Sequence, residues 1–276
     1  MNDTHITKTF ALTGPINLSV RLGRGSVTVH TRDDLEAATV DLAPNPGAEE
    51  LAEQIVAVLV GPTLTIALPR DGRLADIVSV WSHRQRTRDC VAVTVTVPTG
   101  TALKIATTHA PVTVNGRCGG ADVSTGSGAI ALDHVDGDLL LRYGSAGSRV
   151  DRVSGSVKVQ HGAGEARFGT IEGSLEHGCG RGLLDVGEVH GTVRSRNGSG
   201  GARLAAVHGD VDLATGSGAM SIGLPAGAAA HVKATTGSGR VHSDLPIDDR
   251  PKLATSRTIT VRALTGSGDI ELFRAV

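Results

Sequence analysis

The amino-acid sequence predicts an all-β protein, mainly a right-handed parallel β-solenoid (β-helix) with coils of about 18 residues. Three observations lead to this prediction. Apolar residues recur 18 positions apart at Val135, Val153, Ile171, Val189 and Val207. Around them, apolar and polar positions alternate, as expected for short strands with one buried face. The chain also has 37 glycines and only 2% aromatic residues, which suits a narrow interior with tight corners. The right hand follows from the usual handedness of parallel crossovers.

In chain order, the pattern predicts two regions. Residues 1–100 form a β-rich N-terminal or capping region, in which INLSVRLGRGSVTVHT, TLTIAL and VAVTVTVP have the alternation of strands. An Asn-Pro start, early glutamates and apolar Leu51, Ile55 and Leu59 at helical spacing predict one short helix near 47–60. Residues 101–276 form the solenoid, with six regular 18-residue coils at 117–224 and degenerate coils from there to the C-terminus.

The recurring Gly-Ser-Gly motif, as in DLATGSGAMSIGL, is predicted to be a corner. A phosphate-binding loop would need GxxxxGK[ST] between a strand and a helix, and no lysine follows the motif. A calcium-binding repeat would need an aspartate at a fixed place in each copy, and only Asp269 directly follows a Gly-Ser-Gly. Glycine suits a corner because it tolerates a positive φ and lets two backbones approach closely.

Composition and charge argue against several classes of partner. The net charge of −1 and pI near 6.8 provide no basic field for nucleic acid or anionic lipid. The start, MNDTHITKTF, lacks the features of a secretory signal, and no apolar run approaches 18 residues. We therefore expect a cytoplasmic chain that binds neither nucleic acid nor membrane. Three widely spaced cysteines, Cys90, Cys118 and Cys179, predict reduced thiols.

Four segments carry a resemblance to a known family: PGAEELAEQI, HGDVDLATGSGAMSIGL, AAAHVKATTGSGRVHSDL and VRALTGSGDIELFRA. The chain resembles a bacterial β-strand-repeat family of unknown function, sometimes labelled "putative adhesins", and in particular its actinobacterial cytoplasmic members. The resemblance covers nearly the whole chain. It implies a β-solenoid without established catalytic residues, and the adhesin label is a fold-level analogy.

The residues themselves show no enzymatic pattern. β-Helix enzymes that act on polysaccharides need clustered carboxylates and aromatic platforms for sugars, and both are scarce in the repeats. No GxSxG elbow or other nucleophile motif is present. We therefore expect no catalytic residue and no cofactor.

One group of residues could bind a metal ion. With an 18-residue repeat, His177 and Cys179 share one face of a strand, and His161 lies one coil away beside Cys179. A Cys-His-His set of this kind can ligate zinc or copper. The alternative is a polar corner column in which His177 is hydrogen-bonded at the edge of the tube. A second column contains Glu172, His190 and His208 and is expected at an outer corner.

The function predicted from these observations is non-enzymatic. The protein would be a rigid scaffold or protein-interaction module that binds an unidentified protein or a second copy of itself, through strand edges or flat faces. The alternatives are a carbohydrate-binding or carbohydrate-active β-helix protein, and a surface adhesin.

Overall fold

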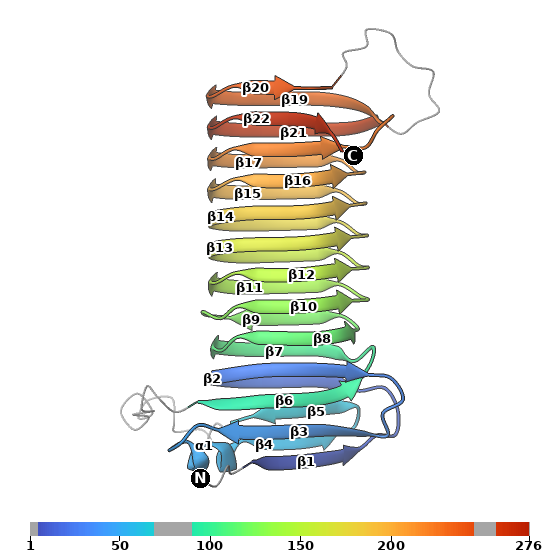
Figure 1. Ribbon diagram of the computed structural model, residues 1–276, viewed down its shortest axis with the longest axis vertical. Helices are drawn as coiled ribbons and strands as arrows, with labels where there is room; N and C mark the ends of the chain where they lie inside the picture. Colours follow the sequence, from blue (N-terminus) through green and yellow to red (C-terminus); the bar gives the residue numbers. More distant parts are fainter. Residues whose placement is uncertain (1–4, 69–89, 246–257, 276) are drawn as a thin grey trace. The chain divides into compact units, whose positions relative to one another are not determined.

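The computed structural model describes residues 5–68, 90–245 and 258–275. The chain divides into two compact units, Met1–Asp133 and His134–Val276. Within the described residues, regular structure is β except for one short helix (Figure 1). The all-β class predicted from the sequence is therefore confirmed. No helix in the described part of the chain is long and apolar enough to cross a membrane.

The first unit contains one helix, and the connections between its strands are irregular. Its elements are β1 (Ile6–Ala11), β2 (Asn17–Arg32), β3 (Ala37–Pro44), α1 (Glu49–Gln54), β4 (Val56–Val60), β5 (Thr63–Ala67), β6 (Val91–Pro98), β7 (Ala102–His109), β8 (Val112–Cys118) and β9 (Ala121–Thr125), while β10 (Ile130–Val135) reaches into the second unit.

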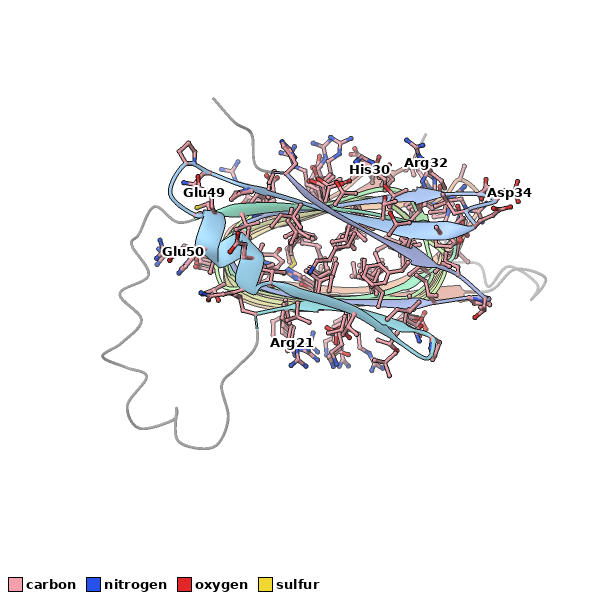
Figure 2. All side chains as sticks on the ribbon, turned by 90° about the horizontal axis from the view of Figure 1, so that it is seen from below. Arg21, His30, Arg32, Asp34, Glu49 and Glu50 are labelled. Atoms are coloured by element: carbon pink, nitrogen blue, oxygen red, sulfur yellow. The ribbon has the colours of Figure 1, made fainter. Side chains whose placement is uncertain are left out.

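Strand β2 organises the first unit. Its first half pairs in parallel with β5 and β7, and its second half pairs in parallel with β6 and β8. Between the halves the strand bends at Gly25, which has a φ of +127° and lies against the backbone of Val91. Arg21 and Arg32, from the two halves, consequently project from opposite walls (Figure 2). Inward residues such as Leu18 and Val27 are completely or almost completely buried.

The helix expected near 47–60 is shorter than the pattern suggested. It ends at Gln54, and residues 56–60 form β4, which pairs antiparallel with β5. The apolar residues 51, 55 and 59 have helical spacing, but Val56, Val58 and Val60 also alternate with period two. β-Branched side chains favour the extended conformation, and pairing with β5 provides the backbone hydrogen bonds.

The second unit consists of parallel strands and their connections. They are β11 (Leu139–Ser145), β12 (Ser148–Val153), β13 (Val157–Ile171), β14 (Leu175–Val189), β15 (Val193–Ser199), β16 (Ala202–Val207), β17 (Val211–Ser217), β18 (Met220–Leu224), β19 (Ala229–Ser238), β20 (Val241–Ser243), β21 (Thr258–Ser267) and β22 (Ile270–Arg274).

The 18-residue register predicted from the sequence is confirmed in this unit. Val153 is paired with Ile171, and Ile171 with Val189. The same register places inward apolar residues directly over one another. One such column, buried throughout, consists of Val150, Phe168, Val186, Leu204 and Ile222. Each column buries its side chains against the copies above and below, which is the main source of stability in such a stack.

The specific fold predicted from the sequence, a right-handed parallel β-solenoid behind an N-terminal cap, is wrong. In that fold all pairs are parallel and turns follow one another in sequence order. Here β1–β3, β3–β6 and β4–β5 are antiparallel, and β2 lies between strands that come later in the chain. In the second unit β21 lies between β17 and β19. The sheet therefore contains both parallel and antiparallel pairs of strands. Its parallel part encloses an apolar interior, and the antiparallel strands β1, β3 and β4 are added to that part.

The glycines of the corners have two different roles. Gly164 has a φ of +123°, and a methyl group there would overlap the carbonyl oxygen of Ala146. Gly162, two residues earlier, has no positive φ, but an added Cβ would lie 2.6 Å from the carbonyl oxygen of Gly144. Both reasons predicted for glycine, positive φ and close approach, are therefore present. The strand continues through the bend, because β13 spans both positions.

Candidate functional site

A buried polar cluster lies within the apolar interior of the second unit. We define the interior cluster as His161, His177 and Cys179. His161 is on β13, and His177 and Cys179 are two residues apart on β14, where Cys179 is paired with His161. Their possible ligand atoms lie within 4.8 Å of one another. His161 and His177 are 7% and 2% exposed, and Cys179 is half-buried. The structure therefore brings together the three residues singled out in the sequence.

A chain of hydrogen bonds fixes the two imidazole rings. The Nε2 atoms of His161 and His177 are 2.9 Å apart, and Nδ1 of His177 is 2.9 Å from Oγ of Ser195. Ser195 donates in turn to Oδ1 of Asn197 at 3.1 Å. On the other side, the ring of Tyr143 stacks on His161 with centroids 4.6 Å apart. The 18-residue repeat in the sequence places Ser195 beside His177, but the hydrogen bond between them was not predicted.

Burial determines the protonation of the cluster. Burial, and secondarily the neighbouring His161, lower the pKa of His177 to about 4. Burial also lowers the pKa of His161, against a smaller opposite effect of the Ala163 backbone. The pKa of the Cys179 thiol is raised by burial. At neutral pH the cluster thus holds two neutral imidazoles and a protonated thiol.

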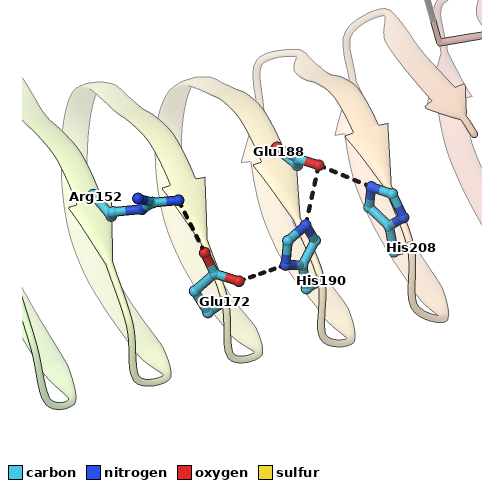
Figure 3. A network of polar contacts seen from close by, with 5 residues as sticks. All are labelled: Arg152, Glu172, Glu188, His190 and His208. Carbon is cyan, nitrogen blue, oxygen red and sulfur yellow. Dashed lines mark hydrogen bonds and ion pairs between the residues drawn. The ribbon is translucent and has the colours of Figure 1, made fainter.

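A second polar group forms a row on an exposed corner (Figure 3). We define the corner row as Arg152, Glu172, Glu188, His190 and His208. His190 contacts Glu172 through Nδ1 and Glu188 through Nε2, and His208 contacts the same oxygen of Glu188 at 3.0 Å. Arg152 pairs with Glu172 at 3.2 Å. The outer corner expected for the two histidines is confirmed.

Hydrogen bonds within the corner row affect its ionisation. Those to Glu188, and then to Glu172, raise the pKa of His190. The bond to His190 lowers the pKa of Glu188. The side chains of His190 and His208 are 40% exposed and that of Glu188 is 42% exposed, so solvent weakens these interactions.

Some charged residues on the strand faces form ion pairs with the next repeat. Lys158 pairs with Glu176 at 3.0 Å, and Arg196 pairs with Asp212 at 2.6 Å. Exposed pairs of this kind contribute on the order of 0.2–1 kcal/mol each.

Edge strand β4 is different. Three of the six exposed large apolar side chains in the described residues belong to it: Val56 at 46%, Val58 at 41% and Val60 at 69%. The strand, VAVLV, carries no charge or proline, the two devices that usually protect an edge. It pairs with β5 on one side, and no strand is paired with its other side in the described part of the chain. Sequence reasoning missed this edge because it assigned residues 56–60 to a helix.

The fold and these sites define an all-β protein of paired, glycine-cornered strands with a polar interior cluster. No family model and no curated protein matches the chain. Among solved structures, a "putative adhesin" from Parabacteroides merdae ATCC 43184 is 9% identical, covers 97% of this chain and 95% of its own, and gives a TM-score of 0.53. A "putative adhesin" from Bacteroides fragilis NCTC 9343 is 11% identical, with 98% of both chains covered and a TM-score of 0.44.

A third similar structure has a different description. A "putative lipid binding protein" from Parabacteroides distasonis ATCC 8503 is 12% identical, with 99% and 97% of the two chains covered and a TM-score of 0.34. Of the three, the Parabacteroides merdae protein shows a shared fold, and at these identities none indicates a shared activity. The resemblance noted in the sequence is thus supported as far as bacterial proteins named as adhesins. Membership of the repeat family, and its actinobacterial type, stay predictions.

Proposed function

We propose that the protein is a non-enzymatic interaction module that associates with a second copy of itself through edge strand β4. The observation that carries the proposal is the row of exposed valines on an uncharged edge, which has no second partner strand among the residues that the structure describes. An edge of this kind presents free backbone donors and acceptors together with apolar surface, and a further strand satisfies both.

The pattern of β4 is self-complementary. If two copies pair antiparallel around a two-fold axis at Val58, Val56 of one copy faces Val60 of the other, and the two Val58 side chains face each other. Ala57 and Leu59 then face one another on the other side of the strand. No charge opposes this pairing within the strand, and cross-strand valine contacts stabilise it. A two-fold contact is closed, so it yields a dimer rather than a filament.

Light scattering after size-exclusion chromatography tests the proposal. We expect the wild-type chain to elute with twice its monomer mass of 28.2 kDa. Val58→Lys should give the monomer mass, because two lysines would meet at the axis, while its far-ultraviolet circular dichroism stays that of the wild type. Val241→Lys is the matched control, since Val241 is similarly exposed, at 47%, on strand β20. This variant should remain dimeric.

Three results would overturn the proposal. The first is a monomeric wild type over the whole soluble concentration range. The second is a Val58→Lys variant that keeps the wild-type mass. The third is dissociation by Val241→Lys alone, which would place the contact on β20.

Adhesion is the second candidate function, because similar structures are named as adhesins. It requires the protein on the cell surface, whereas the sequence led us to expect the cytoplasm. Immunodetection in fractionated cells distinguishes the two. Binding of carbohydrate is less well supported, since Tyr143 and Phe168, the aromatic residues of the repeats, are each only 4% exposed and offer no face to a sugar.

A further inference from the structure

His177, a member of the interior cluster, and Ser195 interrupt an otherwise apolar column. Successive inward positions on the paired strands β11, β13, β14, β15 and β17 hold Leu141, Val159, His177, Ser195 and Leu213. All five are buried. Placing imidazole and hydroxyl groups in such an interior is unfavourable unless their polar atoms are satisfied. A buried departure from a repeat pattern is also where function is expected.

The hydrogen bonds of the cluster leave one buried nitrogen unsatisfied. Because Ser195 donates its hydroxyl hydrogen to Asn197, its oxygen accepts a hydrogen bond from Nδ1–H of His177. Nε2 of His177 therefore has a free lone pair, which accepts a hydrogen bond from Nε2–H of His161. Nδ1 of His161 then has no hydrogen-bond partner, although it is fully buried. The Ala163 backbone is near this ring but does not reach hydrogen-bonding geometry.

We propose that His161, His177 and Cys179 bind one thiophilic metal ion with a filled d shell, Cu⁺ or Zn²⁺, in the interior of the second unit. The donor set combines two imidazole nitrogens and a sulfur, which are the ligands that such ions prefer. Two nitrogens on one tetrahedral ion, each about 2.0–2.1 Å from it, are roughly 3.3 Å apart. The two Nε2 atoms are already 2.9 Å apart, so a small ring movement suffices.

Binding requires few proton movements. His177 keeps its proton on Nδ1, bonded to Ser195, and offers Nε2 to the metal. This is the usual arrangement of a ligating histidine whose second nitrogen is oriented by an acceptor. His161 moves its proton from Nε2 to Nδ1, which frees Nε2 and creates no net charge. The thiol of Cys179 releases one proton to solvent as the sulfur–metal bond forms.

The charge of the complex distinguishes the two ions. One thiolate and two neutral imidazoles make a neutral complex with Cu⁺ and a singly positive one with Zn²⁺. An apolar interior favours the neutral complex. Either ion could enter past half-buried Cys179. We therefore expect tighter binding of Cu⁺.

Metal binding is measured directly on the full-length protein after removal of bound metal with a chelator. Zn²⁺ is titrated in competition with a chromophoric chelator, and Cu⁺ is titrated without oxygen in competition with bathocuproine disulfonate. We expect about one ion per chain in each case. Co²⁺, used as a spectroscopic substitute for Zn²⁺, should give a thiolate-to-metal charge-transfer band in the near ultraviolet. Bound metal should also protect Cys179 from alkylation, as read by mass spectrometry.

The first two substitutions introduce residues that already occupy the same column in other repeats. Cys179→Asn places the asparagine found at Asn197 in the same column, and His177→Leu places the leucine found at Leu141 and Leu213. Both should lose the stoichiometric ion and the charge-transfer band. Ser195→Ala retains all three ligands but removes the group that orients His177, so affinity should fall about 10- to 100-fold.

Two matched controls should bind metal as the wild type does. Cys90→Ala removes a half-buried cysteine elsewhere. His190→Gln disrupts the other group of close ligand atoms, Glu188, His190 and His208.

The proposal is wrong if the wild type binds neither ion more tightly than Cys179→Asn does. It is also wrong if His190→Gln, and not Cys179→Asn, loses the ion, since the metal would then sit on the corner row. The alkylation measurement needs no variant, so it remains decisive if a substitution prevents folding. Equal labelling of Cys179 with and without Zn²⁺ or Cu⁺ contradicts the proposal.

Discussion

Truncation of Ile171 tests whether the second unit is held together by stacked apolar columns. Ile171 is completely buried and is paired with Val153 on one side and Val189 on the other. Ile171→Ala should lower the free energy of unfolding by about 2–5 kcal/mol, because it removes buried methyl groups and leaves a cavity. Ile171→Val should cost only about 0.5–1.5 kcal/mol, since valine occupies the same place in both neighbouring repeats. Urea unfolding followed by circular dichroism measures both values.

The graded series has an internal control. Val241→Ala removes a comparable side chain from an exposed position on β20, outside the proposed β4 contact, and its effect should stay within about 0.5 kcal/mol. If Ile171→Ala were no more destabilising than Val241→Ala, the column around Ile171 would not be packed. The same conclusion would follow if Ile171→Val and Ile171→Ala cost equal amounts.

Three further predictions concern backbone strain and pH. Gly164→Ala should destabilise the protein by about 1–3 kcal/mol or more, because alanine strongly disfavours a φ of +123°, whereas Gly178→Ala, with open space and no positive φ, should be nearly neutral in the same urea assay. His177 has a pKa of about 4 in the folded protein instead of 6.5, so as the pH falls the unfolded chain protonates this histidine before the folded chain does. About 3 kcal/mol of the free energy of unfolding that is present above pH 6.5 should therefore be lost as the pH falls to 4. In chelator-treated protein, His177→Leu should lack this loss, and an unchanged pH profile would contradict the assignment. His190 has the opposite sign. Its raised pKa adds stability below pH 6.5 that disappears as the pH rises through the folded value, so the deficit of His190→Gln should be largest in mild acid and absent in alkali.

The sequence predicted contacts between repeats well, because parallel pairing at a fixed register places equivalent residues next to one another. This is why Val153, Ile171 and Val189 could be placed in one column. The order of the strands was not predictable in the same way. The strands β2 and β21 pair with partners far away in sequence, and every candidate partner has the same alternation and glycine corners. No local signal distinguishes one partner from another.

The candidate sites show the same limit. The 18-residue spacing predicted that His161, His177 and Cys179 lie close together, because the strand register determines which backbone positions are adjacent. It could not give the contact between the Nε2 atoms or the role of Ser195, which depend on side-chain rotamers. The edge strand β4 was missed because residues 51–60 contain two periods at once, and the helical one was followed beyond Ile55. The alternation of Val56, Val58 and Val60 was the signal that could have revealed it.

The position of β2 affects how the protein is made. During synthesis, residues 17–32 leave the ribosome long before β7 and β8, which end at His109 and Cys118 and complete the pairing of β2. At typical elongation rates, the nascent segment waits on the order of ten seconds for these partners. Throughout that interval its backbone and its apolar face are open to wrong partners, including the equivalent segment of a neighbouring chain. Because closure of this kind is slow and non-local, we expect the yield of folded first unit to depend on translation speed and on chaperones.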